Sequence, residues 1–113
     1  MRYFLALALA HLAALIGIAA PAYADSTDDQ FLAALGAAGI TYPDPGKAIA
    51  AGKSVCTMAV DNSMRMVNVV IAIHDSNPRL QWDNAAKFTS IAARTYCPQV
   101  PEEDIWSVPW PHG

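Results

Sequence analysis

The sequence predicts an all-α protein: a small bundle of about four helices, closed by one disulfide and preceded by a signal peptide. Three observations lead to this fold class. Apolar residues recur at the three- and four-residue spacing of an amphipathic helix in successive stretches of the chain. The two cysteines, Cys56 and Cys97, each lie near the end of one of these stretches. A long apolar run occupies the N-terminus.

Residues 1–24 have the layout of a secretory signal peptide. Arg2 gives a short positive start, an apolar run follows from Tyr3 to Ala20, and residues 22–24 form an A-x-A pattern. We therefore expect cleavage after Ala24 and a protein that is secreted or held in the cell envelope, with no membrane span after cleavage. The alternative is an uncleaved anchor, because the run is nearly long enough to span a bilayer.

Size and composition make a disulfide useful to this chain. Of 113 residues, 15% are charged, and the net charge is −3. Without residues 1–24, one small domain remains, for which a hydrophobic core alone gives marginal stability. An exported protein meets an oxidising environment, so Cys56 and Cys97 are expected to pair. The cysteines do not form a C-x-x-C motif, which favours a structural bridge over a redox couple.

The first helix is predicted over residues 27–38. Thr27 and Gln30 form a capping-box pattern at its start. Gly39 is suited to the left-handed conformation that ends a helix. One apolar stripe follows the helical spacing and consists of Phe31, Leu32, Leu35 and Ala38.

The second helix is predicted from Pro45 to about Val60. Asp44 is the expected N-cap, and Pro45 is the expected first residue because its fixed φ suits that position. Gly52 weakens a helix interior relative to alanine, so we expect a neighbouring helix to approach closely there. The predicted inward face consists of Ala48, Ile49, Gly52, Val55, Cys56 and Ala59.

The third helix is predicted to follow a break at residues 61–63, which can cap it. Residues 66–73 are rich in β-branched side chains and could also form a strand. We prefer a helix because these residues do not alternate cleanly and a strand would have no partner. The predicted face consists of Met64, Val67, Val70, Ile71 and His74.

The fourth helix is predicted from about Trp82 to Tyr96. Pro98 disfavours helical conformation at Cys97, so the helix should end there. A bridge from Cys97 to Cys56 would join the fourth helix to the second. The predicted inward face consists of Ala85, Phe88, Thr89, Ala92 and Tyr96.

Residues 99–113 differ from the disulfide-linked helical domain at residues 25–98. They hold three prolines, an acidic trio at residues 102–104, and two tryptophans. This composition shows no helical periodicity and predicts an extended or weakly ordered tail. Trp106 and Trp110 are candidate interaction residues, because tryptophan is enriched at interface hot spots. Alternatively, they fold back over the domain's own apolar surface.

Five segments carry a family resemblance through their order and spacing: Asp29 to Leu35, Gly39-Ile40, Tyr42 to Asp44, Ala51 to Cys56 and Ala92 to Pro98. With these segments the chain resembles the domain of unknown function 732 family, small secreted proteins abundant in mycobacteria. The resemblance covers about residues 28–98. It implies export, a helical domain and a cysteine pair at Cys56 and Cys97, and it implies no established activity or catalytic residue.

The sequence shows no catalytic or metal-binding motif. His74 and Asp75 are adjacent, and adjacent residues on a helix point in different directions. After signal removal, His74 and His112 are the remaining histidines, and no metal-ligand spacing joins them. We expect no cofactor. A mildly acidic chain without a basic cluster also argues against nucleic acid as a partner.

These features favour a non-enzymatic, exported interaction module that contacts an unknown protein partner. The alternative is a carrier of a small apolar or lipid ligand, because a core of small and slender side chains could leave a cavity. An enzyme is the weakest of the three hypotheses.

Overall fold

The computed structural model describes residues 26–111. Within that range the protein is helical and contains no strand, which confirms the predicted all-α class and the helical interpretation of residues 66–73. The predicted signal peptide lies outside the described residues. The elements are a helix at residues 26–37, α2 (Pro45–Cys56), the π-helical turn η1 (Thr57–Asp61), α3 (Met66–Ser76), α4 (Trp82–Tyr96) and the short helix α5 (Glu103–Trp106).

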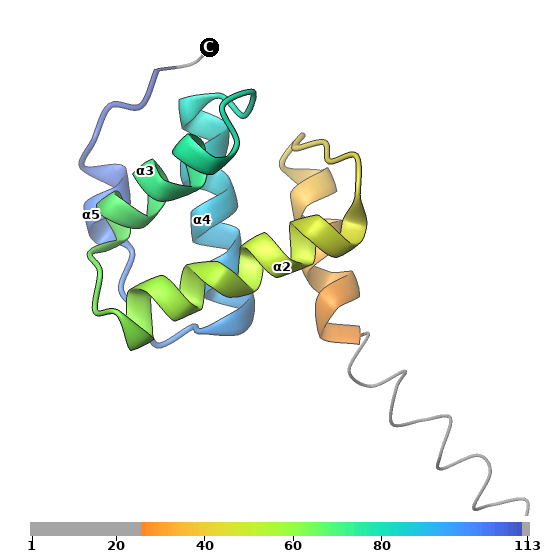
Figure 1. Cartoon of the computed structure of the whole chain (residues 1–113), viewed down its shortest axis with the longest axis horizontal. Coiled ribbons are helices and arrows are strands. Elements are labelled where there is room, and N and C mark those ends of the chain that lie inside the picture. Colours follow the sequence, from red (N-terminus) through yellow and green to blue (C-terminus); the bar gives the residue numbers. More distant parts are fainter. Residues whose placement is uncertain (1–25, 112–113) are drawn as a thin grey trace, which may run out of the picture.

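Helix α4 is the centre of the bundle. Both α2 and α3 pack against it, and α5 packs against α3 on the side away from α2 (Figure 1). The 26–37 helix lies at the opposite end of the molecule, beside α2. Its Phe31 ring reaches the α4 side chain Phe88, with ring centroids 5.5 Å apart in an edge-to-face arrangement. The fully buried apolar side chains of this core include Phe31, Leu35, Val55, Val69, Val70, Ala85, Ala92 and Ile105.

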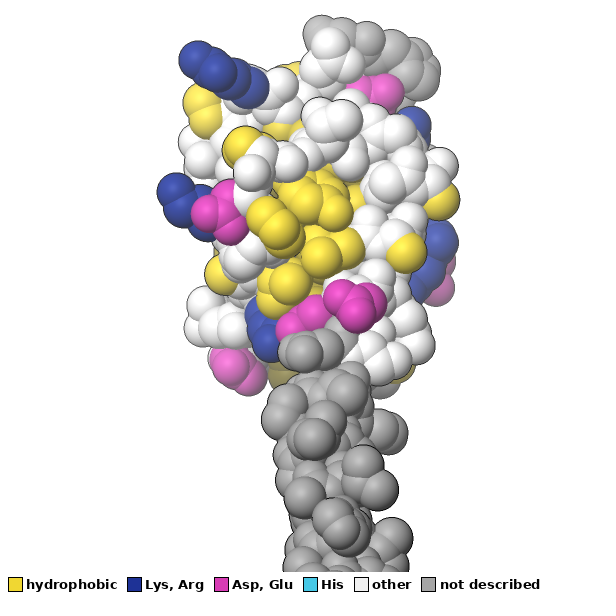
Figure 2. Space-filling model, turned by 90° about the vertical axis from the view of Figure 1, so that its right-hand side faces the viewer, with side chains coloured by type: hydrophobic (Ala, Val, Ile, Leu, Met, Phe, Trp, Pro, Cys, Tyr) yellow, Lys and Arg dark blue, Asp and Glu magenta, His cyan; other side chains and the backbone are white. Residues whose placement is uncertain are grey.

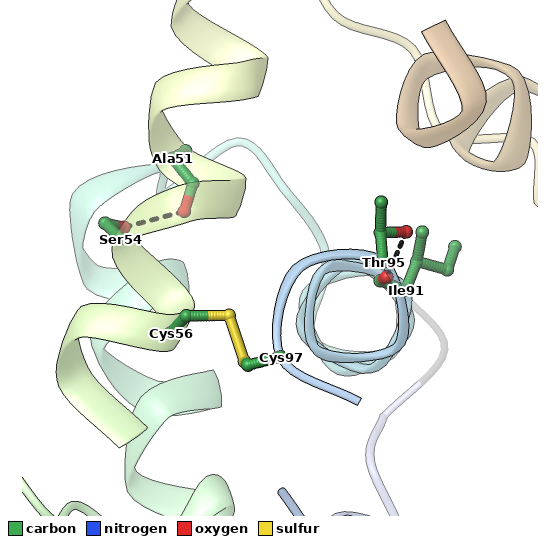
Figure 3. The surroundings of a disulfide bond; sticks show 6 residues. All are labelled: Ala51, Ser54, Cys56, Ile91, Thr95 and Cys97. Atoms are coloured by element: carbon green, nitrogen blue, oxygen red, sulfur yellow. Dashed lines mark hydrogen bonds between the residues drawn. A yellow bond between two sulfur atoms is a disulfide. The ribbon is translucent and has the colours of Figure 1, made fainter. Parts of the chain in front are cut away.

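A disulfide joins Cys56 at the end of α2 to Cys97 directly after α4, with a Cα–Cα distance of 5.9 Å. Figure 3 looks nearly down the axis of α4, while α2 passes beside it, and the bridge spans the two helices. The predicted pairing is confirmed. The predicted close approach at Gly52 is also confirmed, because this residue is buried against the ring of Phe31.

The start of the first helix differs from the prediction. Ser26 is already helical, so Thr27 lies within the helix and is not its N-cap. The polar run at residues 26–29 offers several capping side chains, so the local pattern alone does not select one. Asp28 instead makes a tertiary contact, because its Oδ1 accepts a hydrogen bond of 2.7 Å from the Tyr96 hydroxyl.

Helix α3 begins at Met66 and buries a different face from the predicted one. Its N-terminus is capped from a distant part of the chain, since Asp104 Oδ2 accepts from the Val67 backbone N–H at 3.2 Å. Ile71, which belongs to the predicted face, is 40% exposed. Almost every residue from 66 to 73 is apolar, so helical spacing does not single out one face, and packing against α4 and α5 decides. The buried residues are Met66, Val69, Val70 and Ile73.

The tail also corrects the prediction of an extended or weakly ordered segment. Residues 103–106 form α5, and Ile105 is fully buried. A helix of this length is unstable in isolation. It forms here because Ile105 enters the core and Asp104 caps α3, and both are tertiary effects that leave no periodic pattern in the sequence.

Candidate functional site

A groove of about 730 Å³ opens between two loops of the fold. One wall comes from the loop after the 26–37 helix and the start of α2, and the other from the α3–α4 turn and the start of α4. In Figure 1 these two loops face each other at the upper end of the molecule. The volume lies within the range of small-molecule binding sites in proteins. Its buried apolar floor includes Leu35, Ile40, Ala48, Ile73 and Phe88.

Short-range backbone hydrogen bonds set the conformation of the first wall, the loop after the 26–37 helix. Gly39 adopts a φ of +76°, the left-handed conformation predicted for it. The backbone N–H of Ile40 donates to the Leu35 carbonyl at 3.0 Å, and that of Gly39 donates to the Gly36 carbonyl at 3.0 Å. This is the Schellman hydrogen-bond pattern, in which the residues at its two ends also make an apolar contact. The turn therefore places Ile40 in the floor of the groove.

Helix ends fix the polar side chains around the groove. Asp44 caps α2 as predicted, with its Oδ1 accepting from the Lys47 backbone N–H at 3.2 Å. On the other wall, the Asn77 side-chain amide donates to the Ile73 carbonyl at 2.9 Å and closes the last turn of α3. These polar groups therefore have structural roles at the rim.

Two cations at the groove have no ionic partner within the described part of the chain. Lys47 and Arg79 are both exposed and both line the groove. Neither makes an ion pair with any residue in the described range 26–111, whereas Lys53, Arg65 and Arg94 each pair with a carboxylate. Their side chains are thus available to a ligand.

The candidate residue Trp110 packs against other parts of the same molecule. Its ring stacks on Trp82 with centroids 5.6 Å apart, and Trp82 stacks on His74 at 3.7 Å. The Trp110 indole N–H donates to the Ile105 carbonyl at 2.7 Å. This three-ring stack holds the end of the tail against α3 and α4.

The candidate residue Trp106 lies beside a polar cluster that also anchors the tail. Trp106 is 50% exposed, and its indole N–H points at Glu102 Oε1 at 3.4 Å. Arg94 donates to the same oxygen at 2.8 Å and Ser90 at 2.7 Å. The hydrogen bond from Arg94 is the largest cause that lowers the pKa of Glu102 below its ordinary value, against the opposing effect of burial.

His74 does not form an acid–base dyad with Asp75. Its Nδ1 lies 3.8 Å from the Asp75 carboxylate, too far for a hydrogen bond, and has no hydrogen-bond partner among the residues that the structure describes. Within residues 26–111, no group of three or more histidine, cysteine or acidic side chains is placed to hold a metal ion. In the same range, no helix combines the length and apolarity needed to cross a bilayer.

The face that carries the 26–37 helix has a continuous apolar patch at its centre, with acidic side chains along its lower edge (Figure 2). This helix leaves Ala33 and Ala37 exposed, and Leu32 and Ala34 half-buried. In the second half of this helix the exposed residues are therefore Ala33, Gly36 and Ala37, which have small side chains or none.

The sequence predicted the disulfide, the N-cap Asp44 of α2 and the turn at Gly39. It did not predict the groove. Its two walls lie far apart in the chain, and each is an ordinary loop by itself. The missed residues are Lys47 and Arg79. No signal in the sequence singles out these two residues, because Asp44 lies three positions before Lys47, and Asp75 and Asp83 lie four positions on either side of Arg79.

In comparisons with known proteins, the chain is similar to proteins of mycobacteria. "Putative lipoprotein LprJ" of Mycobacterium tuberculosis H37Rv is 39% identical over 82 residues, which are 73% of this chain and 64% of LprJ. The chain thus spans slightly less than two thirds of the length of LprJ. "Uncharacterized protein Mb1323c" of Mycobacterium bovis is 41% identical over 86 residues, 76% of either chain. No solved structure matches the chain.

A family model matches residues 27–99. The matched region runs from the first helix, through both cysteines, to just after α4, and leaves α5 and the stacked Trp110 outside. The resemblance found in the sequence is therefore confirmed, and the chain belongs to the family described as "Protein of unknown function (DUF732)".

Proposed function

We propose that this protein is an exported, non-enzymatic binding protein that holds an apolar molecule in the groove between its two loops. The observation that carries the proposal is the groove itself: about 730 Å³, with a buried apolar floor and a polar rim. Sites for small molecules combine these features, because an apolar lining supplies affinity and a few polar groups fix orientation.

Three features support export to the cell envelope or the extracellular space. Residues 1–24 have the layout of a cleavable signal peptide. The disulfide between Cys56 and Cys97 is stable in an oxidising compartment. The relative LprJ is named a lipoprotein. In this proposal residues 1–24 are removed, and the alternative remains that they are kept as an anchor.

The roles of the polar groups favour binding over catalysis. Asp44 and Asn77 at the groove are engaged in closing the ends of α2 and α3. The carboxylate Glu102 is engaged by Arg94 and Ser90 in holding the tail. A catalytic acid or base instead needs to be within reach of a substrate proton. We therefore assign no catalytic residue.

Mass spectrometry of the exported protein from its source cells tests the carrier function. Under native conditions we expect a mass in excess of the polypeptide, and under denaturing conditions we expect that excess to disappear. The denaturing mass also reports cleavage after Ala24 and the two hydrogens lost at the disulfide.

A matched pair of variants ties the bound molecule to the groove. Ala51 lines the groove and Ala50, its neighbour on α2, is exposed and does not. Ala51→Phe should fill the groove and remove the excess mass, whereas Ala50→Phe should retain it. Circular dichroism checks that both variants are folded. Equal loading of the two variants, or an unloaded wild type that takes up no apolar probe, would rule out the groove as the site.

The second candidate function is a protein-interaction module, and one observation favours it. Trp106 is 50% exposed on α5 although tryptophan is usually well covered. Exposed aromatic side chains of this size are the type that dominates interface energetics. Trp106→Ala should then weaken binding to an isolated envelope partner by at least tenfold, while Val60→Ala, which truncates another exposed apolar side chain, should not.

A further inference from the structure

We propose that the ligand of the groove is a single-chain fatty acid, with its carboxylate held by Lys47 and Arg79 and its alkyl chain on the apolar floor. This inference rests on the proposed carrier function and adds the chemistry of the head group.

Charge complementarity points to an anion. The protein as a whole is acidic, with a net charge of −3. The groove nevertheless carries two cations, Lys47 and Arg79, and one anion, Asp44. The Asp44 carboxylate is occupied by the cap of α2. A ligand with one negative charge therefore meets a net positive lining on an otherwise negative molecule.

The two cations reach the groove from different walls. Lys47 lies in the first turn of α2, and Arg79 lies in the turn between α3 and α4. Because neither has an ion-pair partner among residues 26–111, an incoming carboxylate breaks no existing pair. A guanidinium also binds a carboxylate through two parallel hydrogen bonds. One head group can thus join the two walls.

The floor of the groove favours one alkyl chain. Tyr42, Ala51 and Leu80 line the groove and are half-buried, so they offer accessible carbon surface to a ligand. The groove volume of about 730 Å³ matches a ligand of ordinary small-molecule size and not a diacyl lipid. A neutral sterol would leave the two cations unused, and a cationic amphiphile would be repelled by them.

Isothermal titration of the disulfide-intact exported protein, after removal of bound lipid, tests the inference. The three probes are palmitate, hexadecanol and hexadecyltrimethylammonium, which share a chain and differ in head-group charge. We expect palmitate to bind most tightly and the cationic probe most weakly. Higher salt should weaken palmitate binding and leave hexadecanol binding unchanged.

Four variants test whether the charges at the groove act on the head group of the ligand. Lys47→Gln and Arg79→Gln should each weaken palmitate binding by up to about fivefold, as expected for a solvent-exposed ion pair. Lys87→Gln removes an exposed charge from α4 outside this groove and should have no effect. Asp44→Asn should strengthen palmitate binding by a similar factor, because asparagine caps a helix as well as aspartate does.

The outcomes separate the inference from the proposed function. If palmitate and hexadecanol bind equally and the four variants are indistinguishable, the fatty-acid inference is wrong and the carrier function stands. If none of the probes binds, or if Ala51→Phe leaves binding unchanged, both proposals fail. Binding to phosphatidylglycerol vesicles without binding of palmitate would also overturn the inference.

Discussion

The ring of Phe31 lies directly on the backbone of Gly52. A Cβ atom at position 52 would stand 2.6 Å from Phe31 Cζ and 2.8 Å from Cε2, far inside van der Waals contact. The ring has no room to retreat, because it is fully buried and packs against Phe88 and Tyr96. This contact joins the first helix to α2 and leads to the first prediction.

Gly52→Ala should lower the free energy of unfolding by about 1–3 kcal/mol, because overpacking exceeds the helix-propensity gain of about 1 kcal/mol. Gly36→Ala is the matched control: no heavy atom would lie within 4 Å of its Cβ. That variant should be stabilised by up to about 1 kcal/mol. Urea unfolding measures both, and shifts of the same sign would contradict the packing argument.

Removing the disulfide should cost about 4 kcal/mol in the chain-entropy description of a loop with a sequence separation of 41. Cys56→Ser and Cys97→Ser should each show this loss, and so should the wild type after reduction. Thermal unfolding with and without reductant checks the prediction. Equal melting temperatures for the oxidised and reduced protein would show that the bridge adds no stability.

The tail should be required for stability, because Ile105 is fully buried and Asp104 caps α3. Ile105→Ala should cost about 2–5 kcal/mol as a buried large-to-small change. Asp104→Ala should cost about 0.5–2 kcal/mol by removing the cap of α3. Glu103→Ala, which changes the exposed residue just before them, is the control. Denaturant unfolding that is identical for all three variants would mean that the tail is undocked in solution.

Acid should weaken the attachment of the tail through Glu102. The pKa of Glu102 is lowered in the folded protein from its ordinary 4.5, chiefly by the hydrogen bond from Arg94. Its contribution to stability is therefore complete above about pH 4.5 and is lost as the pH falls through the lowered value. Glu102→Gln should flatten this part of the stability curve, and Glu103→Gln should leave it intact. Melting temperatures between pH 2 and 6 measure the difference.

Features with local causes could be predicted from the sequence. The start of α2 follows from Asp44 and Pro45, and the end of α4 at Tyr96 follows from the proline after Cys97. Gly39 ends the first helix because glycine, which has no Cβ, readily adopts the left-handed conformation. The pairing of the two cysteines in an exported chain can be predicted without a structure. These signals act over a few residues, so helix limits and the disulfide were accessible.

Features with tertiary causes could not be predicted. The buried face of α3 depends on α4 and α5, and the helix α5 depends on the burial of Ile105. The groove depends on how two loops face each other across the bundle. The cap of α3 comes from Asp104, which follows Val67 by 37 positions. Hydrophobic periodicity relates residues within one helix, so it does not reveal contacts between residues at such separations.

The disulfide also sets how the molecule would respond to a pulling force. Force applied between the two ends passes along the 26–37 helix and α2, crosses the covalent bond from Cys56 to Cys97, and continues into the tail. Residues 57–96, which form α3 and α4, carry none of it, so about 140 Å of chain cannot be extended. One wall of the groove lies on the loaded path and the other in the shielded loop. Tension would therefore load the first wall of the groove directly along the chain, and would reach the second wall only through its packing against α2 and the first helix.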